Sequence, residues 1–147
     1  RVHAANRSAV TSGHVDRAYL LSELHAFLAD VDVVVVTLPL TAQTQGIVDA
    51  AALQSMRPSA WLVNVGRGPV VAEQALYDAL HARRLGGALI DTWYQYPTPT
   101  QPECAPSKLD FAALPNVVMT PQQTMADNIS RLATGRPLLN LLKPAST

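Results

Sequence analysis

The stretch Trp61-Leu62-Val63-Asn64-Val65-Gly66-Arg67-Gly68 decides the fold, because an apolar run ends there on an arginine between two glycines. A buried strand cannot hold a guanidinium, whereas ligands bind beyond the carboxyl ends of strands in open parallel sheets. Glycine lets a backbone and a ligand approach closely, and arginine fits a carboxylate with two parallel hydrogen bonds. The stretch therefore predicts a strand over residues 60–65 that ends at an anion-binding site. The alternative is that Arg67 belongs to a surface loop and forms a salt bridge.

Composition is typical of a globular domain and excludes several classes of partner. The chain has 147 residues, of which 48% are hydrophobic and 15% charged, so a buried core is expected and intrinsic disorder is not. Its 11 basic and 11 acidic residues give a formal net charge of zero, which gives nucleic-acid or anionic-membrane partners no electrostatic support. The apolar runs are strand-length, far below a membrane span. A single cysteine, Cys104, indicates a reducing compartment, and we expect a cytoplasmic protein.

Strand-like and helix-like segments alternate along the chain. Apolar and β-branched runs predict strands at residues 1–5, 32–38, 60–65, 87–91 and 116–120, and the run at 32–38 is apolar enough to be buried on both faces. Helical spacing predicts helices at residues 16–30, 50–56, 71–85 and 125–133, with Asp49 as an N-cap and Gly135 as a C-terminal stop. The proline-rich residues 92–114 predict a long loop. This alternation predicts an α/β fold with a doubly wound, Rossmann-like parallel sheet.

One part of a complete dinucleotide-binding fold is missing. Such a sheet carries a Gly-x-Gly-x-x-Gly loop between its first strand and first helix. No such pattern occurs here, and Gly66-Arg67-Gly68 is followed by Pro69. If residues 1–5 are the second strand, the loop precedes Arg1. We therefore expect a fold that is incomplete at the N-terminus, with an exposed apolar edge and face that favour dimerisation or aggregation.

Four blocks of sequence, in order and in register, resemble the D-isomer-specific 2-hydroxyacid dehydrogenases. The resemblance extends from residue 1 to about residue 121. It implies a partial dinucleotide-binding domain over residues 1–121 and a C-terminal helix and tail over residues 122–147 that return toward a substrate domain. The blocks are Leu38-Pro39-Leu40-Thr41 with Thr44 and Gly46, Asn64-Val65-Gly66-Arg67-Gly68, Ala88-Leu89-Ile90-Asp91, and Leu114-Pro115-Asn116 through Thr120-Pro121.

The resemblance implies roles for single residues. Arg67 falls on the family's arginine that binds the substrate carboxylate and polarises its carbonyl, where a fixed cation stabilises the developing alkoxide. Asp91 falls on a residue that hydrogen-bonds the nicotinamide carboxamide. No metal site is expected, because no His, Cys or Asp cluster has ligand spacing. The other positions that the resemblance places at the cofactor in this part of the chain are Leu38, Pro39, Thr44, Val65 and Gly66.

The turn after the first strand, Asn6-Arg7-Ser8, indicates which nicotinamide cofactor binds. An NAD enzyme places an acidic residue there to accept a hydrogen bond from the ribose 2′-hydroxyl. An acid would repel a 2′-phosphate, whereas an arginine and a hydroxyl bind one. We therefore expect NADP in preference to NAD. The alternative is that Arg7 is simply a solvated turn residue.

Two positions depart from the family pattern. The acid/base histidine expected after Pro121 is Gln122, and the glutamate position is Tyr96. An amide does not donate a proton usefully near neutral pH, and a tyrosine pKa of about 10 requires a large depression before the group can act as an acid. We expect the chain to be inactive as it stands, and our hypothesis is that residues between Pro121 and Gln122 were lost and the histidine with them.

Two functions are consistent with these patterns. The first is NAD(P)H-dependent hydride transfer to a small 2-keto acid such as glyoxylate or hydroxypyruvate, carried out by a homodimer that has neither nucleic-acid nor membrane partners. The alternative is a non-catalytic remnant of the same fold that binds nucleotide weakly or serves as an interaction partner.

Overall fold

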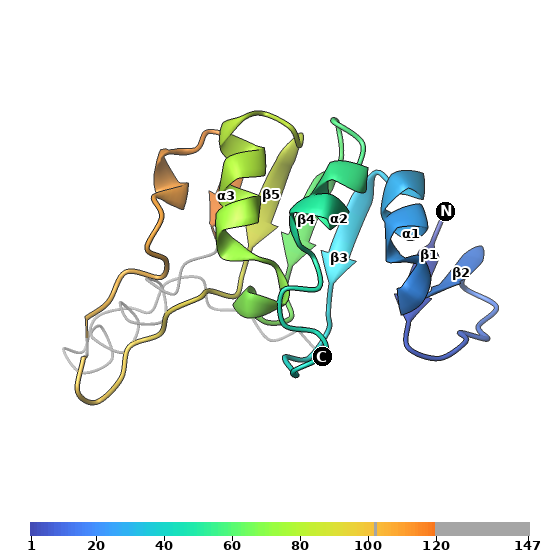
Figure 1. Cartoon of the computed structure of the whole chain (residues 1–147), viewed down its shortest axis with the longest axis horizontal. Coiled ribbons are helices and arrows are strands. Elements are labelled where there is room, and N and C mark those ends of the chain that lie inside the picture. Colours follow the sequence, from blue (N-terminus) through green and yellow to red (C-terminus); the bar gives the residue numbers. More distant parts are fainter. Residues whose placement is uncertain (102, 120–147) are drawn as a thin grey trace, which may run out of the picture.

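Four parallel strands form the main sheet of the computed structural model, which describes residues 1–101 and 103–119. In spatial order they are β3 (Val33–Val36), β4 (Trp61–Asn64), β5 (Gly87–Ile90) and β6 (Val117–Met119). Val33 lies opposite Trp61, which lies opposite Gly87, so β3, β4 and β5 pair without offset at their start, whereas β6 begins opposite Ala88 (Figure 1). The α/β, Rossmann-like parallel sheet predicted from the alternating segments is confirmed.

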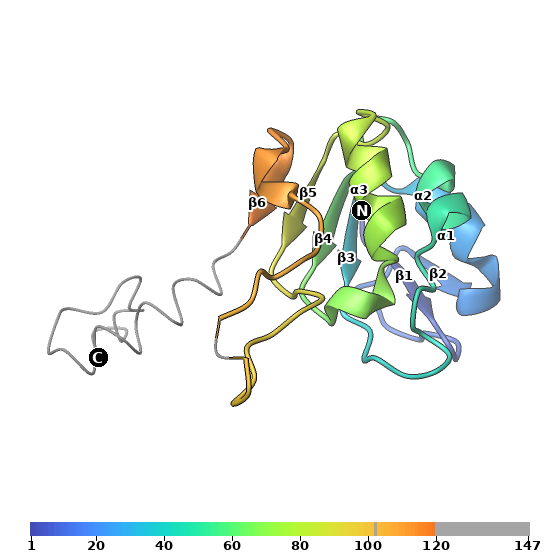
Figure 2. The same cartoon turned by 60° about the vertical axis from the view of Figure 1, so that its left-hand side comes forward.

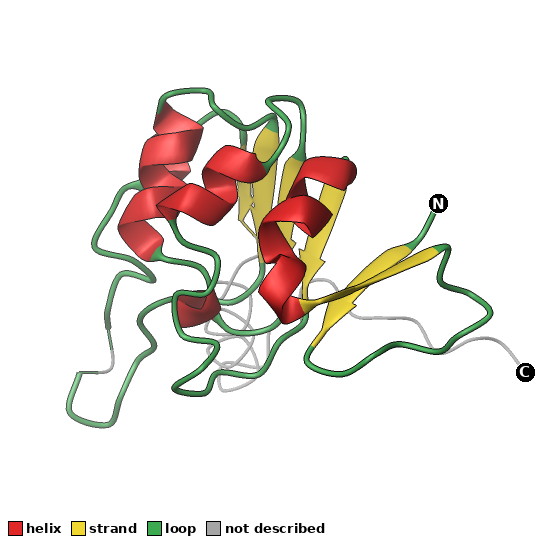
Figure 3. Cartoon of the chain, turned by 45° about the vertical axis from the view of Figure 1, so that its right-hand side comes forward, coloured by secondary structure: helices red, strands yellow, loops and turns green. Residues whose placement is uncertain are grey.

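A second, two-stranded sheet lies beside the first. Its parallel strands are β1 (His3–Asn6) and β2 (Arg17–Leu20), and they pair with each other but not with β3. Figure 3 shows this pair as a separate ribbon next to the main sheet. The prediction of a helix over residues 16–30 is therefore wrong for its first part. Residues 17–20 satisfy their backbone on β1 instead and bury only Tyr19, and the helix α1 (Leu24–Asp30) follows after a 3₁₀ turn, η1 (Leu21–Glu23).

The helices cover one face of the main sheet. Helices α1, α2 (Ala50–Ser55) and α3 (Glu73–His81) lie on the same side of the strands (Figure 2). The predicted N-cap is confirmed, since the Asp49 carboxylate accepts a hydrogen bond of 2.8 Å from the backbone N–H of Ala52. The core between helices and sheet contains Leu28, Val34, Val36, Leu53, Leu62, Leu76, Leu80 and Ile90.

Helix α3 is shorter than the predicted span of residues 71–85. Val48 and Val71 form an isolated parallel bridge, which keeps the chain extended before the helix begins at Glu73. Arg83 has a positive φ of 53°, a conformation that cannot continue a right-handed helix. Arg84 then donates a hydrogen bond of 2.8 Å to the Met56 carbonyl, so the end of this segment is tied to the end of α2.

The remaining described elements are two short 3₁₀ turns, η2 (Gly68–Val70) and η3 (Phe111–Ala113). Residues 92–101 and 103–110 otherwise form the long loop that the prolines predict, apart from an isolated bridge between Thr98 and Gln101. No described helix is long and apolar enough to cross a membrane. The predicted helix over residues 125–133, with its stop at Gly135, lies outside the described residues.

The second face of the main sheet is open within the described part of the chain. Val33 and Val35 are 55% and 56% exposed, whereas Val34 and Val36 are buried. The prediction that residues 32–38 form a strand buried on both faces is therefore wrong, because no described segment covers this side. The Trp61 ring partly covers it and lies against Gly87, where an added Cβ would come within 2.7 Å of the ring.

We expect Gly87→Ala to destabilise the domain, because its methyl group would meet both the Trp61 ring and, at 2.6 Å, the Asn116 carbonyl. Such overpacking costs about 1–3 kcal/mol of unfolding free energy, measurable by urea denaturation. Gly13→Ala is the matched control, since its Cβ would meet nothing within 4 Å. Equal stability of the two variants would contradict the contact between Trp61 and Gly87.

Candidate functional site

A pocket lies at the carboxyl ends of β3 and β4, where an open parallel sheet binds its ligands. Its volume is about 410 Å³. It is formed by the two loops that follow these strands, so it contains the arginine of the Gly-Arg-Gly stretch together with the Leu-Pro-Leu block. The lining residues are Thr37, Leu38, Pro39, Leu40, Val65, Gly66 and Arg67.

Gly66 allows the two loops to touch. A Cβ at this position would lie 2.8 Å from the Leu38 carbonyl oxygen, closer than any side chain permits. The preceding residue continues the sheet, since the Val65 N–H donates to the Val36 carbonyl at 3.2 Å. The glycine is therefore required by backbone packing, and the same close approach brings Leu38, Val65 and Gly66 together at the pocket.

The buried side chain of Asn64 shapes the loop that carries Arg67. Its Oδ1 accepts a hydrogen bond of 3.2 Å from the Gly66 N–H, and its Nδ2 donates one of 3.2 Å to the Arg67 carbonyl. Reasoning from the sequence overlooked this residue. The available signal was an amide side chain at the last position of an otherwise apolar strand.

Arg67 itself is exposed at the edge of the pocket. Its Nη1 donates a hydrogen bond of 2.8 Å to the Gly66 carbonyl, which turns the side chain back along its own loop. Among the described residues it forms no salt bridge. The surface salt bridge of the alternative interpretation is therefore not found in this part of the structure.

A third loop, after β5, joins the same wall through Gly68. A Cβ on Gly68 would collide with the Trp93 carbonyl, so the two backbones are in direct contact. The Trp93 N–H in turn donates to the Tyr96 hydroxyl at 3.0 Å. The loop that contains Tyr96 is thus tied to the loop that contains Arg67. Asp91 lies at the end of β5, with its N–H on the Asn64 carbonyl at 3.0 Å.

Tyr94 and Tyr96 lie in different environments although they are close in sequence. The Tyr94 ring stacks on Phe111, with centroids 6.4 Å apart. Burial, with a smaller contribution from Glu73, raises the pKa of Tyr94 well above its ordinary value, so this hydroxyl stays protonated. Tyr96 is 51% exposed. Tyr96 is therefore the more exposed of the two residues.

Thr44 is buried and holds the turn after β3 in shape. Its hydroxyl donates to the Pro39 carbonyl at 2.6 Å and accepts from the Thr41 N–H at 2.8 Å. Pro39 lines the pocket directly. The hydroxyl of Thr44 is therefore used within the turn, and its contribution to the pocket is the position of Pro39.

The Asn6-Arg7-Ser8 turn is not part of the pocket lining. It follows β1, in the separate two-stranded sheet, and the Asn6 Oδ1 accepts a hydrogen bond of 2.8 Å from the Arg7 N–H. Arg7 and Ser8 are exposed. Gln122 lies outside the described residues, so the structure does not place it.

Histidines are absent from the pocket lining. His25 contacts the Ser55 hydroxyl at 2.7 Å, His81 stacks on Tyr77, and His3 lies against Asp30. His14 is exposed in the loop between β1 and β2. Within the described residues no group of three His, Cys, Asp or Glu side chains is arranged to hold a metal ion.

The fold and the pocket together define a domain of the dinucleotide-binding type. Residues 1–123 match the family model described as D-isomer specific 2-hydroxyacid dehydrogenase, NAD binding domain. The chain therefore belongs to the NAD(P)-dependent D-isomer-specific 2-hydroxyacid dehydrogenases, and the resemblance inferred from the four sequence blocks is confirmed.

Two relatives illustrate how much of such a protein the chain represents. It is 37% identical over 120 residues to a glyoxylate/hydroxypyruvate reductase B of Enterobacter agglomerans, covering 82% of the chain and 35% of that relative. It is 36% identical over 132 residues to an uncharacterised protein of Corynebacterium melassecola, covering 90% of the chain and 41% of that relative. The chain thus spans less than half the length of these relatives.

Solved structures agree with the fold. A D-isomer specific 2-hydroxyacid dehydrogenase from Xanthobacter autotrophicus Py2, in complex with NADPH and MES, matches with a TM-score of 0.71 and 32% identity, over 97% of this chain and 61% of that one. An NADPH-dependent glyoxylate/hydroxypyruvate reductase from Sinorhizobium meliloti, in complex with NADP and sulfate, matches with a TM-score of 0.69 and 28% identity, over 97% and 48%.

We expect Asn64→Ala to destabilise the domain, because it leaves the Gly66 N–H and the Arg67 carbonyl without their partner. Unpaired buried groups of this kind cost about 1–3 kcal/mol of unfolding free energy, measurable by urea denaturation. Asn6→Ala is the matched control, since it removes a single bond in an exposed turn and should change stability by less than about 0.5 kcal/mol. Comparable losses in both variants would contradict the role given to Asn64.

Proposed function

We propose that the chain is the cofactor-binding part of an NADP-preferring reductase of small 2-keto acids such as glyoxylate or hydroxypyruvate. The observation that carries this proposal is the position of Arg67. Its guanidinium lines the pocket at the carboxyl end of β4 and forms no salt bridge with any described carboxylate. Such a cation is suited to a small anionic substrate.

The residues around the pocket fit a nicotinamide nucleotide. Gly66 and Gly68 let the three loops after β3, β4 and β5 pack against one another, which brings the strand ends together at the pocket. Asp91 at the end of β5 would accept a hydrogen bond from the carboxamide, and Leu38, Pro39 and Val65 would contact the nucleotide. The Xanthobacter and Sinorhizobium structures, in complex with NADPH and with NADP, support a cofactor of this class.

The chemistry assigned to this chain's residues is binding and polarisation. The bound cofactor would supply the hydride. Arg67 would hold the carboxylate of the keto acid and polarise its carbonyl, and this interaction strengthens as negative charge develops on the oxygen. Tyr96 and Gln122 stand at the family's glutamate and histidine positions. The Tyr96 hydroxyl accepts a hydrogen bond from the Trp93 N–H, which leaves its own proton available for donation.

Because these two positions lack the family's acid and base, we propose that the chain by itself turns over slowly or not at all. We further propose that residues 1–121 form the partial cofactor domain, that residues 122–147 return toward a substrate domain, and that the protein is a cytoplasmic homodimer. The open face bearing Val33 and Val35 favours such association. The second candidate function is a non-catalytic nucleotide-binding remnant. It is favoured by the same absence of the family's glutamate and histidine at Tyr96 and Gln122.

Arg67→Ala tests the proposed substrate site. We expect glyoxylate affinity, measured by calorimetric titration in the presence of NADPH, to fall about 10- to 100-fold, because a charge-assisted hydrogen bond contributes about 1.5–3 kcal/mol. Affinity for NADPH alone should stay within about twofold of the original. Arg67→Lys is the control, since it keeps the charge without the paired donors and should lose less of the glyoxylate affinity than Arg67→Ala.

Two results would decide against this proposal. A parallel fall in glyoxylate and NADPH affinity would make Arg67 a structural residue. Tight NADPH binding without measurable glyoxylate binding or NADPH oxidation, in protein verified by intact mass, would favour the non-catalytic remnant.

Arg7→Ala tests the preference for NADP. We expect NADPH affinity to fall about tenfold, because a phosphate loses a charged partner, while NADH affinity is unchanged. Both can be followed by quenching of the exposed Trp61 and the buried Trp93. If the variant binds NADPH as well as the original protein does, Arg7 is a solvated turn residue.

A further inference from the structure

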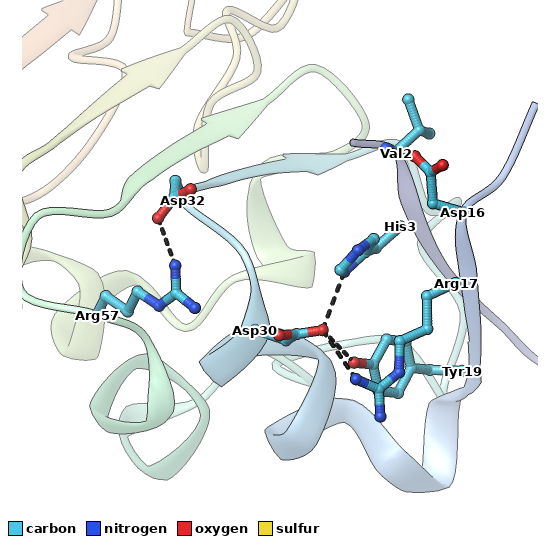
Figure 4. Close-up of polar contacts among 8 residues, drawn as sticks. All are labelled: Val2, His3, Asp16, Arg17, Tyr19, Asp30, Asp32 and Arg57. Atoms are coloured by element: carbon cyan, nitrogen blue, oxygen red, sulfur yellow. Dashed lines mark hydrogen bonds and ion pairs between the residues drawn. The ribbon is translucent and has the colours of Figure 1, made fainter.

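Three side chains from the two-stranded sheet converge on one oxygen at the end of helix α1 (Figure 4). The Tyr19 hydroxyl donates to the Asp30 Oδ2 at 2.6 Å, and the Arg17 Nη1 donates to the same oxygen at 3.2 Å. The His3 Nδ1 lies 3.1 Å from it. Because His3 is in β1 and Arg17 and Tyr19 are in β2, both strands contact a single carboxylate.

Asp30 is an unfavourable residue for its position in the helix. It is the last residue of α1, where the helix dipole favours cations and disfavours a carboxylate. The Tyr19 hydroxyl is the main cause that lowers the pKa of Asp30, and Arg17 and His3 act in the same direction. The hydrogen bond therefore stabilises an ionised side chain that the helix alone would destabilise, which indicates that the contact matters beyond the helix.

The strand pair is not hydrogen-bonded to the main sheet within the described residues. In the described residues, β1 and β2 form ladder hydrogen bonds only with each other. Besides the Asp30 contacts, Tyr19 packs edge-on against Phe27 of α1, with ring centroids 5.6 Å apart. The Arg17 guanidinium lies 4.8 Å from the centre of the Tyr19 ring, so it is part of the same cluster.

The orientation of β1 determines where the Asn6-Arg7-Ser8 turn lies. His3 is the first residue of β1 and Asn6 the last, so the turn follows directly from a strand whose beginning is held by Asp30. A paired strand is stiff, and a tilt at one end moves the other. A site for a charged ligand requires its residues within about 0.5 Å of the productive position.

We propose that Asp30 is a positioning residue for cofactor recognition: by fixing the β1–β2 pair on α1, it places Arg7 and Ser8 to bind the 2′-phosphate of NADP. This inference rests on the proposed function, which assigns the turn to the cofactor. It adds Asp30, which contacts the start of β1 while the turn follows the end of β1, and which does not itself contact the nucleotide.

Asp30→Asn tests the inference, with Asp32→Asn as the matched control. Asp32 is two residues away and forms an exposed salt bridge of 2.6 Å to Arg57, which does not involve β1 or β2. The probes are adenosine 2′-monophosphate and adenosine, because they differ by the one phosphate that the turn is proposed to bind. Affinities are measured by ligand-observed NMR, and thermal melts verify that each variant is folded.

We expect Asp30→Asn to lower the affinity for adenosine 2′-monophosphate by about five- to tenfold and the affinity for adenosine by less than about twofold. Effects of this size are in the range seen for coupling through packed networks. Asp32→Asn should change neither. In an Arg7→Ala background the effect of Asp30→Asn on the phosphate should disappear. If Asp30→Asn does not fold, Tyr19→Phe removes one donor and should give a smaller loss of the same selectivity.

The outcomes separate the two proposals. If the original protein binds adenosine 2′-monophosphate no better than adenosine, the assignment of the turn to the cofactor fails. If it does prefer the phosphate and Asp30→Asn leaves that preference unchanged, or weakens both probes equally, the positioning role of Asp30 is overturned while the cofactor site stands.

Discussion

The close contact between Gly66 and the Leu38 carbonyl is the constraint on which the pocket depends. It brings the loop after β4 against the loop after β3, and Asn64 holds that loop by hydrogen bonds on either side of the Gly66–Arg67 peptide. Gly68 makes the equivalent contact with the loop after β5. The two glycines on either side of Arg67 therefore allow the loops after β3, β4 and β5 to pack together, and Arg67 lies at the edge of the pocket that they form.

This arrangement explains why the charged residue can be tolerated at the end of a buried strand. The backbone of the Gly-Arg-Gly stretch is paired or packed on both sides, while the side chain of Arg67 leaves the core at the pocket rim. Its bond to the Gly66 carbonyl uses one donor. A guanidinium has five N–H donors, so bidentate binding of a carboxylate remains chemically available.

Local patterns in the sequence predicted those parts of the fold that local forces determine. The main-sheet strands, the Asp49 cap and the place of Arg67 at a strand end follow from apolar runs, capping chemistry and glycine spacing. Residues 17–20 could not be assigned in this way, because their β structure depends on pairing with β1, a partner distant in sequence. The burial of Val33 and Val35 depends on what covers the sheet, and a run of four valines does not encode that.

The same distinction separates Arg67 from Asp30. Arg67 could be found because its neighbours in sequence are also its neighbours in space. Asp30 could not, since the three groups that surround it come from residues 11 to 27 positions away, and its carboxylate looks like an ordinary helix-surface residue until they converge. The pocket and the Asn6-Arg7-Ser8 turn also belong to different sheets. Sites without shared partners affect free energy nearly additively, so we expect substitutions in the Asn6-Arg7-Ser8 turn and at Arg67 to have nearly independent effects.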